Sequence, residues 1–331
     1  MKGVGFMLNQ TNRPTNKAAE EIIQKYFPVL DSGFISLIDY SGTDQCIERA
    51  ARVSYGGGGT RKVSDTNNLL RYLHRHNHST PLEMIDLKFH CCAPIFIMRQ
   101  WIRHRISSTN EMSGRYSLMP MMFYLPEKEQ FQLQNKNNKQ GRGNDVDLAI
   151  YNNAKSMLQN HRAHAVDLYS YMTGEDVARE IARIDLPLST YTQWYWKINL
   201  RSLFNFLTLR TDSHAQWEIR QYANIIAGMV KRVAPLSYDA WLDYDVCGER
   251  FSHQELEIIR SLLKTDDNGV FTNGDRISPL PDTISKRERD ELIEKLQPKE
   301  KPDFELDLSQ AKSPDFFEKK MSDAVPPTLK E

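Results

Sequence analysis

The chain has 331 residues, enough for one large domain or two, and 40% of them are hydrophobic, which is sufficient for a substantial core. Lysine plus arginine equals aspartate plus glutamate, at 43 each, so the composition excludes a chain-wide basic field for nucleic acid and a general acidic excess. Any recognition of an anion must therefore be local.

Cysteine usage and hydropathy predict the compartment. The four cysteines, which are Cys46, Cys91, Cys92 and Cys247, have no repeated spacing, so we predict free thiols in a reducing cytoplasm. No apolar run reaches the length of a membrane span, and residues 1–10 do not resemble a signal peptide. We therefore expect a soluble cytoplasmic protein.

The first part of the chain predicts an extension followed by mixed strand and helix. Residues 1–32 have no sustained pattern, and we assign them to an N-terminal extension. Apolar and polar residues alternate in part over 33–40, which favours a strand, and the spacing over 44–53 and 67–76 favours two helices.

Two polar stretches between these elements resemble ligand sites but have simpler explanations. Four glycines at 56–59 resemble a phosphate loop, but the lysine after them precedes Val63 where such a loop needs Ser or Thr, so we predict a surface loop. His74, His76 and His78 alternate, which would bring them together only on an extended strand. Because they follow a helix, we predict no metal site.

The middle of the chain predicts a strand, a polar loop and a long helix. The apolar run 87–98 is the strongest strand candidate and leads into a helix. Residues 126–143 are rich in Gln, Asn, Lys and Gly, which indicates a surface loop, and 145–173 predict a long amphipathic helix. Aromatic residues over 190–198 favour a strand or the lead into a helix.

The helix predicted over 200–233 is polar on both flanks and apolar between them. At 3.6 residues per turn, Arg201 and Asn205 share one side, whereas Arg210 and His214 form an i, i+4 pair on another. A helix of this kind either breaks close to Arg210 or serves two sites at a subunit boundary.

Residues 103–115 follow the apolar run and contain three arginines but only one carboxylate, that of Glu111. Partly buried guanidinium groups need carboxylate or phosphate partners, and Glu111 can balance at most one of them. This local excess of positive charge predicts an anionic ligand. Ser113 and Gly114 add a hydroxyl and a closely approachable backbone amide, so a nucleotide monophosphate fits the chemistry.

His104 lies between two cations in the sequence, Arg103 and Arg105. If the three side chains converge, repulsion disfavours the imidazolium form, and we predict a neutral ring that exchanges a hydrogen bond with a ligand ring system. The alternative is that these arginines are ordinary surface charges on a helix and turn.

The motif in this segment resembles the signature of the flavin-dependent thymidylate synthases, which is Arg-His-Arg, here 103–105, followed after seven residues by a serine, here Ser113. Three further stretches resemble the same family, at 49–54, 79–83 and 199–218. Four matches in the family's order make chance agreement remote.

The resemblance implies an enzyme that moves a one-carbon unit from 5,10-methylenetetrahydrofolate to C5 of dUMP, with NADPH reducing FAD and reduced FAD supplying the hydride. It implies a mixed α/β (α+β) fold in which an antiparallel-rich central sheet is flanked by long helices, and a homotetramer with active sites shared between subunits. We expect the catalytic domain over 33–247. Residues 248–331, in which charges and prolines dominate from 265, would be a weakly ordered extension.

Binding roles carry over from the family to the positions that match its motifs. The resemblance implies that FAD is held by Ser54, Thr80, Glu83, Arg103, His104, Arg105, Glu111, Asn199, Arg201, Asn205 and His214. It implies that dUMP is held by Gln100, Arg103, Glu111, Ser113, Gly114, Arg115, Arg183 and Arg210. The implied catalytic residues are Arg210, which would polarise the uracil and favour ionisation at N3, and His104.

Two points about this assignment remain open in the sequence. We prefer a phosphate-binding role for Ser113 over a nucleophilic one, because the sequence places no histidine base beside it. Residue 84 is Met where the family often has histidine, and the loops at 56–59 and 132–143 resemble insertions.

The rival interpretation is a non-enzymatic nucleotide- or RNA-binding protein that uses the arginine segment and nearby aromatics such as Trp101. It predicts a basic face and salt-sensitive binding of a polymer. Zero formal net charge argues against it. We expect no metal, no nucleic acid and no membrane as partners.

Overall fold

The computed structural model describes residues 12–54, 66–136, 141–262, 264–265, 271–272 and 302–325. The chain divides into two compact units, residues 1–239 with 304–331 and residues 240–303. Every predicted site residue belongs to the first unit. The glycine run at 56–59 lies outside the described residues.

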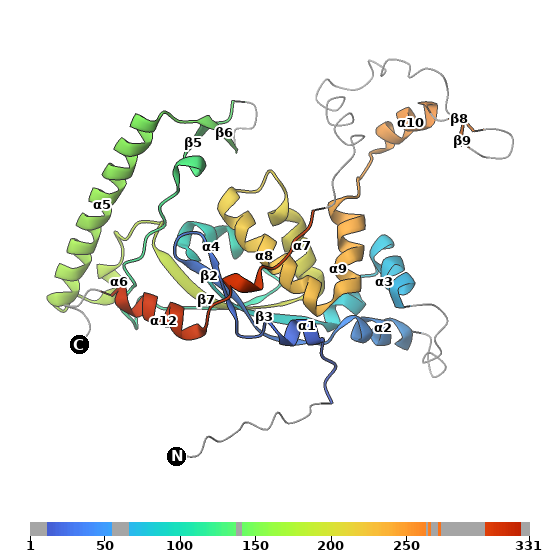
Figure 1. Cartoon of the computed structure of the whole chain (residues 1–331), viewed down its shortest axis with the longest axis horizontal. Helices are drawn as coiled ribbons and strands as arrows, with labels where there is room; N and C mark the ends of the chain where they lie inside the picture. The colour runs from blue at the N-terminus through green and yellow to red at the C-terminus, as the bar shows by residue number, and fades with distance from the viewer. Residues whose placement is uncertain are drawn as a thin grey trace. The chain divides into compact units, whose positions relative to one another are not determined.

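The core of the first unit is a five-stranded antiparallel sheet in the order β1-β2-β3-β7-β4 (Figure 1). Its strands are β1 Tyr26–Val29, β2 Gly33–Ser41, β3 Asp86–Pro94, β7 Tyr191–Asn199 and β4 Ser108–Glu111. The central strands β3 and β7 pair along their full lengths. This arrangement confirms the mixed fold with an antiparallel-rich sheet.

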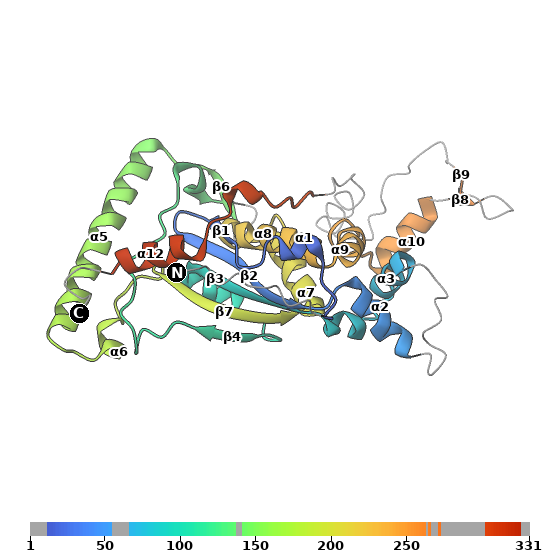
Figure 2. The same ribbon diagram turned by 60° about the horizontal axis from the view of Figure 1, so that its bottom comes forward.

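Helices cover the sheet because they bury their apolar sides against it. The longer helices of this unit are α2 Asp44–Val53, α3 Thr66–Arg75, α4 Ile95–Trp101, α5 Leu148–Gly174, α7 Leu200–Thr211, α8 Trp217–Val233 and α9 Pro235–Trp241, and the short ones are α1 Lys17–Glu20, α6 Arg179–Ala182 and the 3-10 turn η2 Thr80–Met84. α8 lies against β1, β2, α1, α4 and α7. Figure 2 shows α7 and α8 over one face of the sheet.

The helix predicted over 44–53 is confirmed at those bounds, and the strand predicted over 33–40 is confirmed as β2. The strand predicted over 87–98 is wrong beyond Pro94, which is the N-cap of α4. The apolar run continues through the strand into a buried helix, and periodicity does not separate the two over a short run. Pro94 itself marks the change, because proline suits a helix start.

The helix predicted over 200–233 is two helices, which confirms a break close to Arg210. α7 ends at Thr211, and Asp212 adopts an extended backbone while its carboxylate accepts a hydrogen bond from the His214 amide at 2.7 Å. Local capping by an aspartate competes with helix continuation in this way. The predicted i, i+4 pair of Arg210 and His214 is therefore wrong, because His214 lies in the loop.

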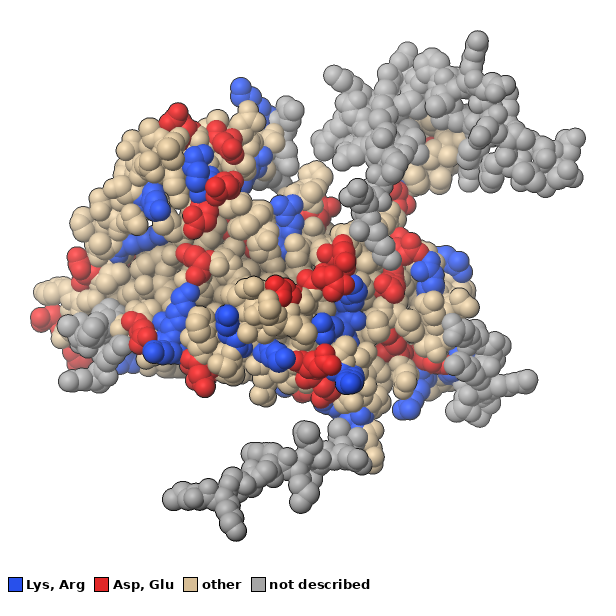
Figure 3. Space-filling model, in the orientation of Figure 1, with Lys and Arg blue, Asp and Glu red and all other residues tan. Residues whose placement is uncertain are grey.

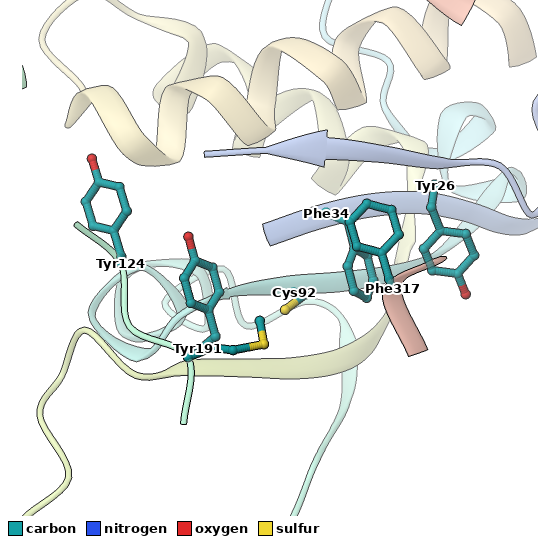
Figure 4. Packing of buried hydrophobic residues seen from close by; sticks show 7 residues of the cluster. Tyr26, Phe34, Cys92, Tyr124, Tyr191 and Phe317 are labelled. Carbon is teal, nitrogen blue, oxygen red and sulfur yellow. The ribbon is translucent and has the colours of Figure 1, made fainter. Parts of the chain in front are cut away.

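The chain ends differ from the expected extensions. Residues 26–29 form an edge strand of the sheet, and Tyr26 exchanges backbone hydrogen bonds of 2.9 and 2.7 Å with Lys312. In the C-terminal helix α12 (Pro314–Asp323), Phe317 is 2% exposed and packs against Tyr26 and Phe34 (Figure 4). Residues 302–325 thus complete the core, although their charged composition predicted weak order.

The remaining elements include a short hairpin of β5 Gln132–Gln134 and β6 Arg142–Asp145. The second unit contains the π-turn η4 Leu242–Val246, helix α10 His253–Leu262 and the paired strands β8 Lys264–Thr265 and β9 Phe271–Thr272. All four cysteines are free thiols, as predicted. Among the helices of the described ranges, none combines the length and the apolar character that a membrane crossing needs.

Candidate active site

His104 and Arg210 form a hydrogen-bonded pair at the C-terminal end of α7. Arg210 Nε donates to His104 Nε2 at 3.1 Å, and the His104 ring packs edge-on against Phe206 with ring centroids 4.9 Å apart. Burial, and secondly the Arg210 charge, lower the pKa of His104 to about 4. The predicted neutral histidine is confirmed, but its cationic neighbour is Arg210 rather than the adjacent arginines.

The arginines beside this pair have no acidic partner among the described residues. In the described part of the chain, Arg103, Arg105 and Arg201 form no ion pair, and all three are exposed. Glu111 balances none of them, because its Oε1 accepts a hydrogen bond from Thr192 Oγ1 at 2.7 Å. Guanidinium groups gathered without carboxylates suit an anionic ligand such as a phosphate.

A second group of predicted cofactor residues lies around the N-terminal end of α7. The turn η2, which carries Thr80 and Glu83, packs against α2, which ends at Ser54, and against α7, which carries Asn199, Arg201 and Asn205 at its start. Asn199 is the N-cap of α7 and accepts a hydrogen bond from the Ser202 amide at 2.8 Å. One turn apart on α7, Arg201 and Asn205 are both exposed.

Residues 103–107 lead from the C-terminal end of α7 to β4, which pairs with β7 close to the start of α7. His104 contacts Arg210 near the end of the helix, whereas Ser108 opens β4 opposite Lys197, just before the helix begins. Arg105 lies in the segment between His104 and β4.

Ser113, Gly114 and Arg183 come together at α6. A Cβ atom on Gly114 would lie 2.8 Å from Met119 Sδ and 3.1 Å from Arg183 Cδ, so only glycine lets Arg183 approach the backbone here. The Ser113 hydroxyl accepts a hydrogen bond from the Arg115 amide at 3.3 Å. No histidine of the described ranges hydrogen-bonds to Ser113, which agrees with a binding role.

Arg115 is held less firmly. Its Nε lies 3.0 Å from Glu180 Oε2, with both side chains more than half exposed. Such an ion pair contributes little in water, and Arg115 remains free to exchange Glu180 for an anionic ligand.

The remaining predicted nucleotide residue, Gln100, belongs to a partly buried hydrogen-bond network that the sequence did not predict. Gln100 donates to Gln216, Gln216 donates to Glu218 at 2.9 Å, and Glu218 also pairs with Arg142 and accepts from Tyr124 at 3.0 Å. The sequence contained one signal, a glutamate on the buried side of α8. Arg142 gave none, because it lies in a stretch that reads as a surface loop.

A polar cavity of about 620 Å³ lies between the β5–β6 hairpin and the loop joining α7 to α8. Arg142, His214 and Gln216 are among its lining residues, and none of the lining residues is acidic. His214 is exposed and forms a hydrogen bond with Asp212 at 2.9 Å. Predicted to lie at the flavin or folate, it borders this cavity instead of joining the Arg210 pair.

The predicted dUMP residues occupy different parts of the structure. Arg210 pairs with His104 and Gln100 bonds to Gln216, whereas Gly114 and Arg183 meet at α6. No hydrogen bond or ion pair within the described ranges joins the Arg210 group to the Arg183 group. Across the same ranges, no three His, Cys, Asp or Glu side chains are grouped in a way that could hold a metal ion.

Comparison with known proteins identifies relatives over most of the chain. Residues 36–236 match the family described as thymidylate synthase complementing protein. A flavin-dependent thymidylate synthase of Rickettsia bellii is 41% identical, covering 88% of this chain and all of the relative, and one of Wolbachia pipientis is 42% identical, covering 87% and 98%. One of Treponema denticola is 46% identical, over 75% of this chain and 93% of the relative.

The fold also matches solved structures. The UMP/dUMP methylase PolB of Streptomyces cacaoi, bound with 5-Br dUMP, is 30% identical and superposes with a TM-score of 0.60, covering 66% of this chain and 97% of that one. The same protein bound with 5-Br UMP gives 31% identity and a TM-score of 0.59.

Proposed function

Because this chain belongs to the flavin-dependent thymidylate synthase family, we propose that it methylates C5 of dUMP to form dTMP, with 5,10-methylenetetrahydrofolate as the one-carbon donor and NADPH-reduced FAD as the hydride source. The observation that carries the proposal is the Arg210–His104 pair set among arginines that lack counter-charges. This arrangement suits an anionic nucleotide and an anionic cofactor side by side.

The residues present fit FAD. Arg103, Arg105 and Arg201 are exposed cations that form no ion pair in the described part of the chain, and a diphosphate offers them anions. His104, Asn205 and the turn η2 would hold the rest of the molecule. When bound, the flavin supplies the redox chemistry, so the protein's part is orientation and electrostatics.

The nucleotide would be held from both ends. Ser113, Arg115 and Arg183 offer a hydroxyl and two guanidinium groups to its phosphate. Arg210 gives its Nε–H to His104, so its two terminal nitrogens remain for the uracil. A fixed cation at the ring stabilises negative charge at N3 and raises the nucleophilicity of C5.

The active site would be shared between subunits of a homotetramer. Two observations support this: no hydrogen bond or ion pair of the described residues joins the Arg210 group to the Arg183 group, and α5 leaves large apolar side chains in water. Those exposed side chains are Leu148, Ile150, Met157, Leu168 and Tyr171. A helix with this much exposed apolar surface marks a protein interface.

The four free thiols favour a cytoplasmic location for the protein, because the cytoplasm keeps thiols reduced.

The rival function gains no support from the face shown in Figure 3. Lysine and arginine side chains are interspersed with acidic ones on the face shown in Figure 3, without a continuous basic field. A protein that binds a nucleic-acid polymer needs such a field.

The visible spectrum of the purified protein tests the proposal. We expect the absorption of bound or readily loaded flavin, its bleaching by NADPH, and dTMP formation that requires both flavin and the folate. A protein that takes up no FAD, or that bleaches without forming dTMP in the presence of folate and dUMP, would contradict it.

A further inference from the structure

Glu218 is a buried carboxylate on α8, the helix after the one that carries the predicted binding residues Arg201, Asn205 and Arg210. It is 2% exposed at the start of α8. Tyr124, Arg142 and Gln216 all direct hydrogen-bond donors at it. A buried carboxylate with this many donors is fully satisfied, and the donors are fixed by it in return.

We infer that Glu218 is a positioning residue that acts through Gln216 to fix which end of the Gln100 carboxamide faces the nucleotide. The inference rests on the proposed function, because it needs Gln100 at the nucleotide. It concerns a hydrogen-bond chain of three side chains, Gln100 to Gln216 to Glu218.

The direction of this chain follows from the carboxylate. An ionised carboxylate only accepts hydrogen bonds, so Gln216 must present its amide nitrogen to Glu218 and its oxygen to the other side. That oxygen needs a donor, so Gln100 must present its own nitrogen to Gln216. Oε1 of Gln100 then points away from this series of hydrogen bonds.

Arg142 and Tyr124 keep the carboxylate in place. Arg142 pairs with Glu218 and also donates to Gln130 at 3.3 Å, which anchors the β5–β6 hairpin to the same network. Burial and the nearby Glu218 charge raise the pKa of Tyr124, so its hydroxyl remains a donor. Reversing the two carboxamides would set Gln216 Oε1 against the Glu218 carboxylate, so that two acceptors would face each other without a donor.

The consequence is selectivity for a ligand group that donates. A deoxyuridine nucleotide carries two such groups near its ring and sugar, the N3–H and the 3′-hydroxyl. Gln100 Oε1 accepts from one of them. A group that only accepts, such as the unprotonated ring nitrogen of cytosine, would meet Oε1 with repulsion.

Nucleotide binding to the FAD-loaded protein distinguishes the two donors. Calorimetry would compare dUMP with 2′,3′-dideoxyuridine monophosphate, which lacks the 3′-hydroxyl, and with N3-methyl dUMP. We expect one analogue to bind roughly three- to tenfold more weakly than dUMP, the value of one neutral hydrogen bond. For Gln100→Ala that difference should vanish for the same analogue, and its persistence for both analogues would overturn the inference.

A double-mutant cycle tests the role of Glu218. Gln100→Glu places a carboxylate against the oxygen of Gln216. Glu218 prevents the Gln216 carboxamide from turning over, because it holds the amide nitrogen. In Glu218→Gln, Gln216 can turn over and donate to the new carboxylate. We therefore expect Gln100→Glu to weaken dUMP binding by a clearly larger factor in the native background than in Glu218→Gln.

Two outcomes of this cycle overturn the inference. One is that the two fold-changes simply multiply, as they would for a carboxylate with a purely structural role. The other is that Glu218→Gln leaves the preference between dUMP and the analogues unchanged. Failure of the proposed function would look different, because native protein would then neither bind dUMP nor form dTMP.

Glu48→Gln is the matched control. Glu48 is also a shielded glutamate that accepts from an arginine and a hydroxyl, Arg52 at 2.9 Å and Thr66 at 2.6 Å, but it lies on α2 away from Gln100. We expect it to lower the melting temperature without changing the order in which the three nucleotides bind.

Discussion

The pairing of His104 with Arg210 determines the charge of both side chains. A guanidinium group only donates, so the ring nitrogen that faces it must carry no proton. Burial disfavours charge on each of them, since it lowers the pKa of Arg210 as well as that of His104. The pair is therefore most stable with a neutral histidine and a cationic arginine.

This pairing predicts how the protein responds to acid. The folded-state pKa of His104 is about 4, below its ordinary value of 6.5, so the unfolded chain binds the proton more readily. The stability that neutral His104 contributes is complete above pH 6.5 and is lost as the pH falls towards 4. A histidine NMR titration checks this, and a midpoint near the ordinary value would contradict it.

The variant Arg210→Gln separates the two causes of the low pKa. Removing the cation should raise the pKa of His104, yet not to its ordinary value, because burial is the larger cause. The same titration measures the shift. Turnover should be lost while some flavin is retained, and a pKa that does not move would show that Arg210 is not the neighbour in solution.

Gly114→Ala adds one carbon atom beside the residues that we propose hold the nucleotide phosphate. The added methyl would meet Met119 and Arg183, so Arg183 must move. We expect dUMP affinity to fall by about tenfold, as for loss of a hydrogen bond to a charged group, with flavin uptake unchanged. Gly174→Ala is the control, because a Cβ there meets nothing within 4 Å. Equal dUMP affinities in the two variants would rule out this role for Gly114.

At the scale of elements, α12 gives the clearest test, because two adjacent phenylalanines face opposite environments. Phe317 is 2% exposed in the core, whereas Phe316 is 50% exposed. Phe317→Ala should cost about 3–5 kcal/mol of unfolding free energy and Phe316→Ala about 0.5 kcal/mol or less. Denaturant unfolding measures both, and similar losses would mean that α12 does not pack as described.

The sequence predicted the elements whose signals are local. Partial alternation located β2 and apolar spacing located α2, although β2 is buried at successive positions from Gly33 to Leu37 and does not alternate. The sequence missed what depends on distant partners: β1 is a strand because β2 and Lys312 pair with it, and the half-buried Arg142 forms an ion pair because the buried Glu218 on α8 lies beside it. No pattern around Arg142 contains that information, since an arginine in a polar stretch normally faces water.

The residues of the predicted site also divide into those with local sequence signals and those that depend on distant partners. Motif spacing identified Arg103, His104 and Arg105 as neighbours, and the neutral state of His104 was predicted from nearby positive charge, whereas burial is the larger cause of its low pKa. The partner that supplies the charge, Arg210, comes from a helix about a hundred residues later, and only the fold brings it close. His214 was misplaced because helical periodicity was extended across a turn that Asp212 terminates.

At the scale of the whole molecule, the exposed side of α5 has to be explained. Met157 is 72% exposed and Tyr171 67%, although the helix is long and well capped by Asp147. Replacing Met157 with lysine should prevent assembly without unfolding the chain, because the side chain meets water in the monomer. Size-exclusion chromatography with light scattering measures this, and an unchanged oligomer would exclude Met157 from the contact.

Mixing two inactive variants tests whether the active site is shared. Arg183→Ala removes the phosphate side of the nucleotide site and Arg210→Ala the uracil side, and each should abolish turnover alone. If one copy supplies Arg183 and another supplies Arg210, some sites in a mixed oligomer receive both intact halves, and co-expression of the two variants under different affinity tags should restore part of the dTMP formation. Doubly tagged oligomers without activity would instead mean that each chain builds its own site, with the two groups of residues brought together by a movement within it.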